Sequence, residues 1–406
     1  MSTTGITKAS SVSLRGARAP VRFYQFLGAH SLLIGLFPFF IPVYLWNSGA
    51  SLAQLSLYIA LTGVAFCLSL RCWEWLSIRL ARAHLMMLTY WLEVLLLSVV
   101  LAFAAEDFAH AAEPLVMLGL VTGIYNCFFW MTQRTLFLEL ITHKNSGRQY
   151  GNFQIFVGVF LKGGIFAGGI LLEYLGFEWV FAASLLTVVL ITLVLTRLPF
   201  ESSANPPTQP VTLAELRNFN DRHRSKTIFV VDGLFLFLES HFWTVSLFVL
   251  SDQDFARLGI IVILLAVVFA VAFFVAKNTI DRYTGSTIYR VATVLYALSW
   301  ILRAVTDNDL PLHWLFLVLL LITFFSSFFR LSFNKRFYDV ALAHQPRDYL
   351  VIKSYYTQAC VGLIFLVLAL LANWLNNDAL SLSLLYLTGA FVSLAYLRYL
   401  PATDTK

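Results

Sequence analysis

The sequence is poor in charged residues, and this alone excludes most classes of protein. Only 12% of its 406 residues are Asp, Glu, Lys or Arg, against about 25% in an average soluble domain. Hydrophobic residues make up 59%, and the mean hydropathy is +0.77. A soluble protein of this size needs a charged surface. The composition therefore excludes a secreted protein, a nucleic-acid-binding protein and a soluble enzyme, and it predicts a protein embedded in a lipid bilayer.

Sequence motifs for catalysis or metal binding are also missing. There is no Walker-type phosphate loop, no GxSxG nucleophile motif, and no His, Cys or Glu cluster with metal-ligand spacing. No regular run of arginines suggests a voltage sensor, and no filter-like repeat suggests a channel. The cysteines lack CxxC spacing and are interpreted as small apolar residues: Cys67, Cys72, Cys127 and Cys360. We therefore expect no catalytic residue, no metal and no cofactor.

Long apolar runs fill most of the chain. A membrane-spanning helix needs about 20 apolar residues, so the length allows twelve of them. The polar, basic residues 1–21 lack a signal-peptide cleavage site. Twelve apolar runs, bounded by polar residues, Gly or Pro, lie near 23–46, 53–70, 84–104, 114–134, 152–172, 178–197, 227–250, 257–276, 288–304, 312–332, 350–373 and 380–399. The pattern predicts an all-α integral membrane protein with 12 transmembrane helices.

The distribution of Lys and Arg predicts the orientation. With the N-terminus in the cytoplasm, all but three of the 28 Lys and Arg residues fall in tails and loops on that side. The exceptions are Arg257 and Arg303, in loops on the other side of the membrane, and Lys162, in the middle of a helix. This is the positive-inside bias, and adding or removing one helix would destroy it. It predicts cytoplasmic N- and C-termini in a cell membrane, and the compact loops suggest a bacterial inner membrane.

A polar loop at 198–226 divides the twelve runs into six and six. It opens with a Pro/Ser-rich stretch and continues with Thr212 followed by Glu215, the pattern of a capping box that predicts a short helix on the inner surface. The predicted organisation is a cytoplasmic tail at 1–21, a six-helix bundle at 22–197, a cytoplasmic loop at 198–226, a second six-helix bundle at 227–399 and a tail at 400–406.

The two predicted bundles contain a similar order of residues, which indicates an internal repeat. The first reads Phe128-Phe129, Arg134, His143, Arg148 and Tyr150; the second reads Phe328-Phe329, Arg336, His344, Arg347 and Tyr349. The gaps between matching residues differ by only one or two positions.

This architecture resembles the major facilitator superfamily. Residues 163–181, with clustered glycines followed by a Gly-aromatic-x-Trp-x-Phe pattern, are similar to the helix-5 region of that family. Gly147-Arg148 before Gly151, and Asp281-Arg282 before Gly285, resemble two of its loop motifs. The loop after the second helix departs from the family pattern, because it lacks the usual Gly and Asp. The resemblance implies two pseudo-symmetric bundles around one cavity that opens alternately to each side.

The resemblance also assigns roles to a few residues. Asp281 and Arg282 would pair with helix ends at the inner face and latch the outward-open state. The glycines of the fifth run would allow close helix approach and sliding: Gly158, Gly163, Gly164, Gly168 and Gly169.

Charged and polar residues in the middle of apolar runs are the candidate site. A charge in the bilayer centre costs roughly 2.5–3.5 kcal/mol on insertion scales, so such residues face the bundle interior or water. Helical spacing places Asp232, Glu239 and Trp243 on one face and turns His241 elsewhere. The substrate- or proton-binding candidates are Glu93, Asn126, Trp130, Arg134, Lys162, Asp232, Glu239, His241, Trp243 and Arg330, with His30 as a further polar residue.

These residues leave several roles open. Glu239 or Glu93 could carry a coupling proton, and Lys162 or Arg134 would pair with it or bind an anionic substrate group. Alternatively, an interior Glu–Lys pair holds helices together and transports nothing. Lys162 and Arg134 suit an organic anion, whereas Glu93, Asp232 and Glu239 suit an organic cation.

The sequence therefore predicts a secondary active transporter of a small organic solute, coupled to protons and monomeric, with no nucleic-acid partner. Two alternatives are a non-transporting membrane assembly factor that kept the fold and a lipid flippase.

Overall fold

The computed structural model describes residues 23–103, 112–140, 146–196, 209–280, 285–307, 310–399 and 401, and all regular structure within them is helical. Eleven described helices are long and apolar enough to cross a membrane. The twelfth span is α11, which is also apolar over Phe255–Val267, the part of this helix whose side chains the structure describes. The elements are η1 (Pro38–Phe40), α2 (Ile41–Asn47), α3 (Leu52–Arg79), α4 (Arg82–Ala102), α5 (Ala112–Leu140), α6 (Ser146–Tyr174), α7 (Phe177–Thr196), α8 (Leu213–Asn218), α9 (Ser225–Phe237), η2 (Leu238–Phe242), α10 (Trp243–Val249), α11 (Phe255–Ile280), α12 (Gly285–Val305), α13 (Leu312–Leu342), α14 (Pro346–Leu375), α15 (Asp378–Ser393) and η3 (Leu394–Arg398).

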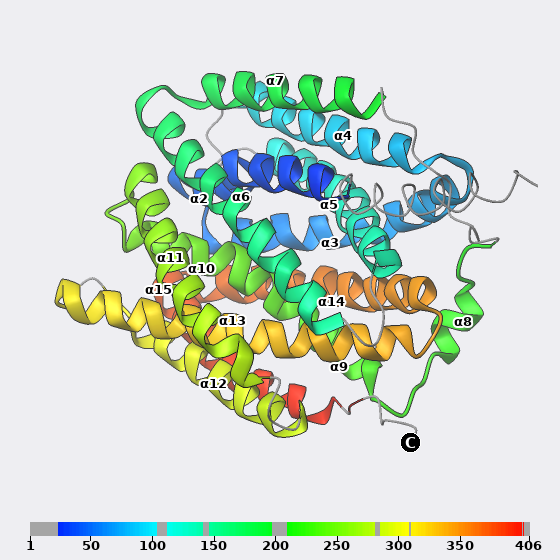
Figure 1. The fold of residues 1–406 in the computed structure, drawn as a ribbon. Helices are drawn as coiled ribbons and strands as arrows, with labels where there is room; N and C mark the ends of the chain where they lie inside the picture. Colours follow the sequence, from blue (N-terminus) through cyan, green and yellow to red (C-terminus); the bar gives the residue numbers. More distant parts are fainter. Residues whose placement is uncertain are drawn as a thin grey trace, which may run out of the picture.

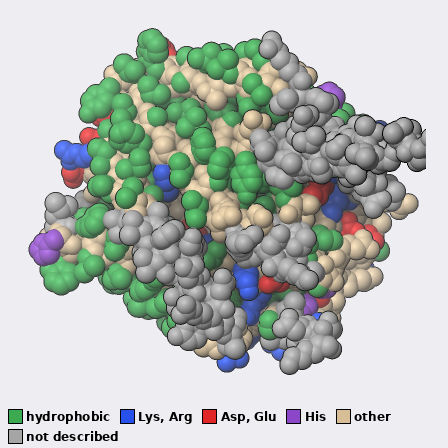
Figure 2. Space-filling view, in the orientation of Figure 1, with side chains coloured by type: hydrophobic (Ala, Val, Ile, Leu, Met, Phe, Trp, Pro, Cys, Tyr) green, Lys and Arg blue, Asp and Glu red, His purple; other side chains and the backbone are tan. Residues whose placement is uncertain are grey.

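The helices form two groups that follow the order of the chain. In Figure 1 the helices up to α7, the first half, lie above those from α9 onward, the second half. The halves meet along two helix pairs, α3 with α14 and α6 with α11. In the face shown in Figure 2, hydrophobic side chains cover most of the upper part, as a lipid-facing surface requires. The predicted all-α membrane fold with twelve spans is confirmed.

Several helices extend beyond the apolar runs that predict them. The helix α5 continues to Leu140 and α13 continues to Leu342, each past the end of its apolar run. The reason is that polar residues such as Gln, Arg and Lys have good helix propensity, so a helix need not end where hydrophobicity ends. Arg336 consequently lies within a helix rather than in a loop.

The internal repeat is visible as matching contacts in the two halves. Phe137 of α5 packs edge-on against Tyr150 of α6, with ring centroids 6.0 Å apart. Phe337 of α13 packs against Tyr349 of α14 at 5.6 Å. One phenylalanine of each Phe-Phe pair in the repeat also stacks on an aromatic ring of its own half. The ring centroids of Phe129 and His30 are 3.8 Å apart, and those of Phe329 and Tyr296 are 4.1 Å apart.

Only some glycines of α6 mark close helix crossings. A Cβ at Gly164 or Gly168 would collide with backbone of the first span (Phe23–Asn47), and one at Gly169 would collide with Phe255 of the second half. Gly158 and Gly163 have nothing within 4 Å of such a Cβ. The predicted role in close approach is therefore wrong for these two, because their side of α6 faces open space.

The tightest contact between the halves at mid-span is the crossing of α3 and α14. A Cβ at Gly63 would come 2.8 Å from the backbone nitrogen of Gly362 and 2.9 Å from the carbonyl oxygen of Gln358. We expect Gly63→Ala to lower the unfolding free energy by about 1–3 kcal/mol through overpacking. Thermal unfolding of the detergent-purified protein measures this effect. The matched control Gly158→Ala adds its methyl in open space, and equal melting temperatures for the two variants would contradict the prediction.

The central loop bridges the halves at one end of the molecule, called here the central-loop end. The predicted capping box at α8 is present: the Glu215 backbone N–H donates to Thr212 Oγ1, and the Thr212 N–H donates to Glu215 Oε2. This last hydrogen bond lowers the pKa of Glu215. Val211 next to the box donates its N–H to the buried Glu74 of α3 at 2.8 Å, while Tyr356 of α14 donates to the Leu216 carbonyl at 2.7 Å. The loop thus binds α3 and α14 together.

The opposite end, called the far end, is closed by two carboxylates that each bind a helix start in the other half. Asp378 of α15 accepts from the Leu52 N–H at the start of α3, at 3.3 Å. Glu173 of α6 accepts from the Phe255 N–H at the start of α11, at 3.1 Å. A carboxylate at a helix N-terminus is favourable because it meets free N–H groups and the positive end of the helix dipole. With the loop contacts, these bonds hold the halves together at both ends.

Candidate functional site: a charged cluster in the second half

Four charged residues of the second half form one hydrogen-bonded cluster. Arg330 of α13 donates from Nη1 to Asp232 of α9 and from Nε to Glu239 of η2, both at 2.8 Å. Lys353 Nζ of α14 lies 2.8 Å from the second oxygen of Asp232. Tyr396 of η3 donates its hydroxyl to Asp232 at 3.0 Å. Three helical segments distant in sequence from α9 therefore converge on the Asp232 carboxylate.

The cluster pairs two carboxylates with two cations in the low-dielectric interior, and a third cation, Arg303, lies within electrostatic range of Glu239. The Asp232 and Lys353 side chains are only 4% and 6% exposed. Arg330 and Glu239 are more accessible, at 22% and 21%. Glu239 Oε1 and Arg330 Nη2 are buried atoms without a hydrogen-bond partner. The cluster therefore has one sealed end at Asp232 and one end with spare hydrogen-bonding capacity at Glu239.

Glu239 lies in an irregular turn of its helix. The seventh span is α-helical to Phe237, forms a π-helical turn at Leu238–Phe242, and continues as α10. Such turns are rare and often occur at functional sites. Because a π turn accommodates an extra residue, the register beyond it is rotated. Asp232 and Glu239 share a face as predicted, because both bind Arg330. Trp243 packs against Arg303, whose guanidinium lies 4.9 Å from the ring centroid and within electrostatic range of Glu239.

His241 points away from the cluster, as its spacing predicts. Its Nδ1 lies 2.8 Å from Ser240 Oγ, and its ring is 5.9 Å from that of Tyr58 on α3. His241 therefore faces the first half.

The first half holds a second, fully enclosed polar group. Glu93 of α4 and His30 of the first span are both 0% exposed, with His30 Nδ1 at 3.5 Å from Glu93 Oε2. The other ring nitrogen of His30 lies 3.0 Å from the Tyr125 hydroxyl. Neither carboxylate oxygen of Glu93 accepts a hydrogen bond from a described residue. This group has no described contact with the charged cluster.

A polar stripe on α5 faces the second half across a small hollow. Asn126, Trp130 and Arg134 are each half-buried, at the predicted spacing of four. Trp130 and Arg134 line a hollow of about 10 Å³, roughly the space for one water molecule. Phe66 completes the first-half wall, and the second half contributes Leu236, Lys353, Ser354, Thr357 and Gln358. The hollow is therefore closed to any organic solute in this structure.

The ion pairs differ from those expected. Glu239 pairs with Arg330 and Glu93 contacts His30, so the expected pairing of either acid with Lys162 or Arg134 is wrong. Within the described chain, Arg134 has no ion pair or hydrogen bond and contacts only the Trp130 ring, 5.3 Å away. Lys162 is half-buried on α6 and likewise has no polar partner among the described residues. The expected pairing fails because spacing along one helix cannot show which neighbouring helix faces it.

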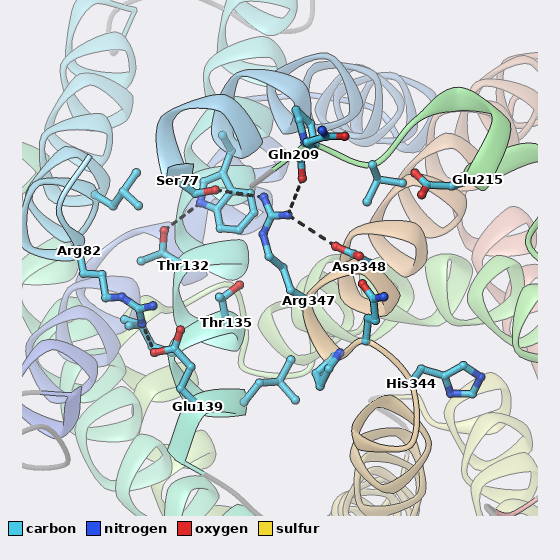
Figure 3. A pocket seen from close by; sticks show the side chains of 18 of the residues that line it. Ser77, Arg82, Thr132, Thr135, Glu139, Gln209, Glu215, His344, Arg347 and Asp348 are labelled. Carbon is cyan, nitrogen blue, oxygen red and sulfur yellow. Dashed lines mark hydrogen bonds and ion pairs between the residues drawn. The ribbon is translucent and has the colours of Figure 1, made fainter. Parts of the chain in front are cut away.

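A larger cavity of about 690 Å³ opens at the central-loop end (Figure 3). Arg347 of α14 projects into its centre and donates to Ser77 Oγ at 3.3 Å and to the Gln209 carbonyl at 3.4 Å. Arg82 and Glu139 form an ion pair at one side. Lys353 follows Arg347 by six residues, so the central hollow lies about 9 Å deeper along α14. The cavity and the hollow thus share the helices α5 and α14.

Two polar residues were missed or misplaced by the sequence analysis. Tyr396 was missed because an aromatic ring in an apolar run is interpreted as an interface or core residue. Arg303, expected in a loop, is 4% exposed and lies 4.3 Å from the Trp300 ring centroid. Asp281 and Arg282 lie outside the described residues.

The fold and the buried charges define a class: a multi-pass membrane protein of two helical halves with ionised groups in its interior. The Major Facilitator Superfamily matches residues 27–349. The chain therefore belongs to this superfamily and is a secondary transporter rather than an enzyme.

Solved structures agree with this assignment. A crystal structure of the nucleoside transporter NupG is similar with a TM-score of 0.66 and 12% identity, covering 93% of this chain and 97% of that one. A mutant of NupG gives the same TM-score at 13% identity, covering 93% and 98%. At such identity the likeness shows the fold alone. No curated protein matches the chain by sequence.

Proposed function

We propose that the protein is a proton-coupled transporter of a small organic solute, in which the bundles 22–197 and 227–399 rock about the charged cluster. The observation that carries this is Arg330, which bridges Asp232 and Glu239 across two helices of the second half. Ionised groups inside a membrane are costly and mark substrate or proton paths. A bundle that only supported other proteins would not require them at this position.

Glu239 is the proposed proton carrier. Its Oε2 accepts from Arg330, and the Tyr296 hydroxyl lies beside the same carboxylate, so a proton can be added at Oε1 without breaking the bond to Arg330. Protonation would weaken the hold on Arg330, because a charge-assisted hydrogen bond is stronger than a neutral one. Glu93 is the weaker candidate, since it is 0% exposed and its described ionisable partner is an equally buried histidine. We propose that Glu93 and His30 hold the first bundle together.

The proposed orientation places the central-loop end in the cytoplasm. The exposed Arg217, Arg222, Arg224 and Lys226 gather at this end, and cytoplasmic loops of membrane proteins are enriched in such residues. The 690 Å³ cavity would then be the cytoplasmic vestibule of the path. A monomer in a bacterial inner membrane is the proposed working form.

Reconstitution tests the proposal. The purified full chain is placed in liposomes with a pH-sensitive dye inside, and uridine, benzoate and benzylamine are added in turn. Uridine is chosen because NupG is a nucleoside transporter. We expect at least one solute to exchange across the membrane and to change the internal pH, with neither change in protein-free liposomes. If none of the three solutes exchanges across the membrane or changes the internal pH, the proposed function is contradicted.

A further inference from the structure

We propose that the substrate is an organic anion, and that its negative group binds between Arg134 of the first half and Lys353 of the second. This rests on the proposed transport function and names its substrate class. The hollow between the two residues is a described space, deeper than the cavity of Arg82 and Arg347, in which cations of opposite halves line one wall each.

Charge balance is the first argument. Asp232 and Glu239 together neutralise Arg330 and Lys353, which leaves no carboxylate of the cluster for Arg134. Glu93 is enclosed with His30 in the first bundle. The hollow therefore carries an excess of one positive charge, from a guanidinium with no anionic partner in the described chain. An anion is the ligand that offsets this excess, whereas a cation would add to it.

The chemistry of the walls is the second argument. Beside the two cations, the hollow is lined by Gln358, whose side-chain N–H groups can donate to an anion, and by Ser354 and Thr357, whose hydroxyls donate to the carbonyls of Leu350 and Phe229. Phe66, Trp130 and Leu236 supply apolar surface. Arginine and lysine bind carboxylate or phosphate oxygens, and an indole ring packs against an apolar or aromatic body. The walls therefore fit an amphiphilic anion, such as an aromatic carboxylate or a nucleoside monophosphate.

Opening of the hollow is the third argument. Its walls belong to different halves, so a rocking motion that separates α5 from α14 widens it directly. The two cations then face the same widened space, and an anion between them draws the halves together again. Lys353 is already shared with Asp232 at 2.8 Å, so the incoming anion competes with Asp232 for it. The substrate would thereby act on the charged cluster from the side opposite to Arg330.

Binding to the purified full chain tests this inference without any transport measurement. The probes are matched in shape and differ in charge: benzoate, benzamide and benzylamine, and uridine against uridine monophosphate. We expect benzoate or uridine monophosphate to raise the unfolding temperature in proportion to its concentration, and the neutral and cationic probes to leave it unchanged. In Arg134→Gln the anion should bind at least tenfold more weakly, whereas Arg134→Lys should retain most of the binding.

Arg79→Gln is the matched control, because Arg79 is an exposed arginine that rests on the Trp75 ring. It should bind the anion as the unchanged protein does. The inference is overturned if neither anion stabilises the protein, or if Arg134→Gln responds as fully as the control. If uridine or benzylamine is carried with protons while no anion binds, this inference fails and the proposed function stands. If an anion binds through Arg134 but no solute or proton moves, the proposed function fails instead.

Discussion

Asp232→Asn should reduce the unfolding free energy by about 3–5 kcal/mol, the usual cost of removing one partner from a buried ion pair. Asp232 binds Arg330, Lys353 and Tyr396, and its side chain is only 4% exposed. An asparagine keeps the shape but leaves Lys353 without a described counter-charge in a low-dielectric site. The measurement is thermal or denaturant unfolding of the purified protein in detergent.

A compensating variant makes this prediction specific. Asp232→Asn combined with Lys353→Met removes both charges of the pair, so we expect the double variant to regain a large part of the lost stability. Asp252→Asn is the matched control, because Asp252 is an exposed residue whose ion pair with Arg257 lies at the far end. Exposed pairs contribute at most about 1 kcal/mol. Equal losses for Asp232→Asn and Asp252→Asn would show that Asp232 is not the centre of the cluster.

Glu239→Gln should abolish the response of solute flux to an imposed pH gradient while leaving the protein folded. The glutamine oxygen can still accept a hydrogen bond from Arg330, so the contact between η2 and α13 is retained. The glutamine side chain cannot take up or release a proton, so the change of charge that couples solute flux to proton flux is lost. The measurement is solute uptake into liposomes with and without a pH difference, together with solute exchange at equal pH.

Glu93→Gln is the comparison for this variant. Glu93 is a carboxyl of the other half that is 0% exposed, and we expect it to retain the pH response. An unchanged pH response in Glu239→Gln would remove Glu239 from the coupling step. Loss of the response in Glu93→Gln alone would transfer the role of proton carrier to the first bundle.

The sequence indicated the general position of the site because buried charge is costly in lipid. Glu93, Asp232, Glu239 and Arg330 stand out in apolar runs for that reason alone. Spacing along one helix also predicted correctly that Asp232 and Glu239 share a face. No local sequence signal predicts the π turn at Leu238–Phe242 in which Glu239 lies.

What the sequence determined by itself is the class of protein, the number of spans and the capping box at Thr212. These follow from local properties: hydropathy over about 20 residues, and hydrogen bonds between neighbours in the chain. Only the tertiary structure decided which charges pair. Arg330 binds Asp232 although the two residues are 98 positions apart in the sequence, and Lys353 binds Asp232 from a third helix. Such pairs depend on the rotation and packing of whole helices, and the same packing leaves Arg134 without a carboxylate in the described chain.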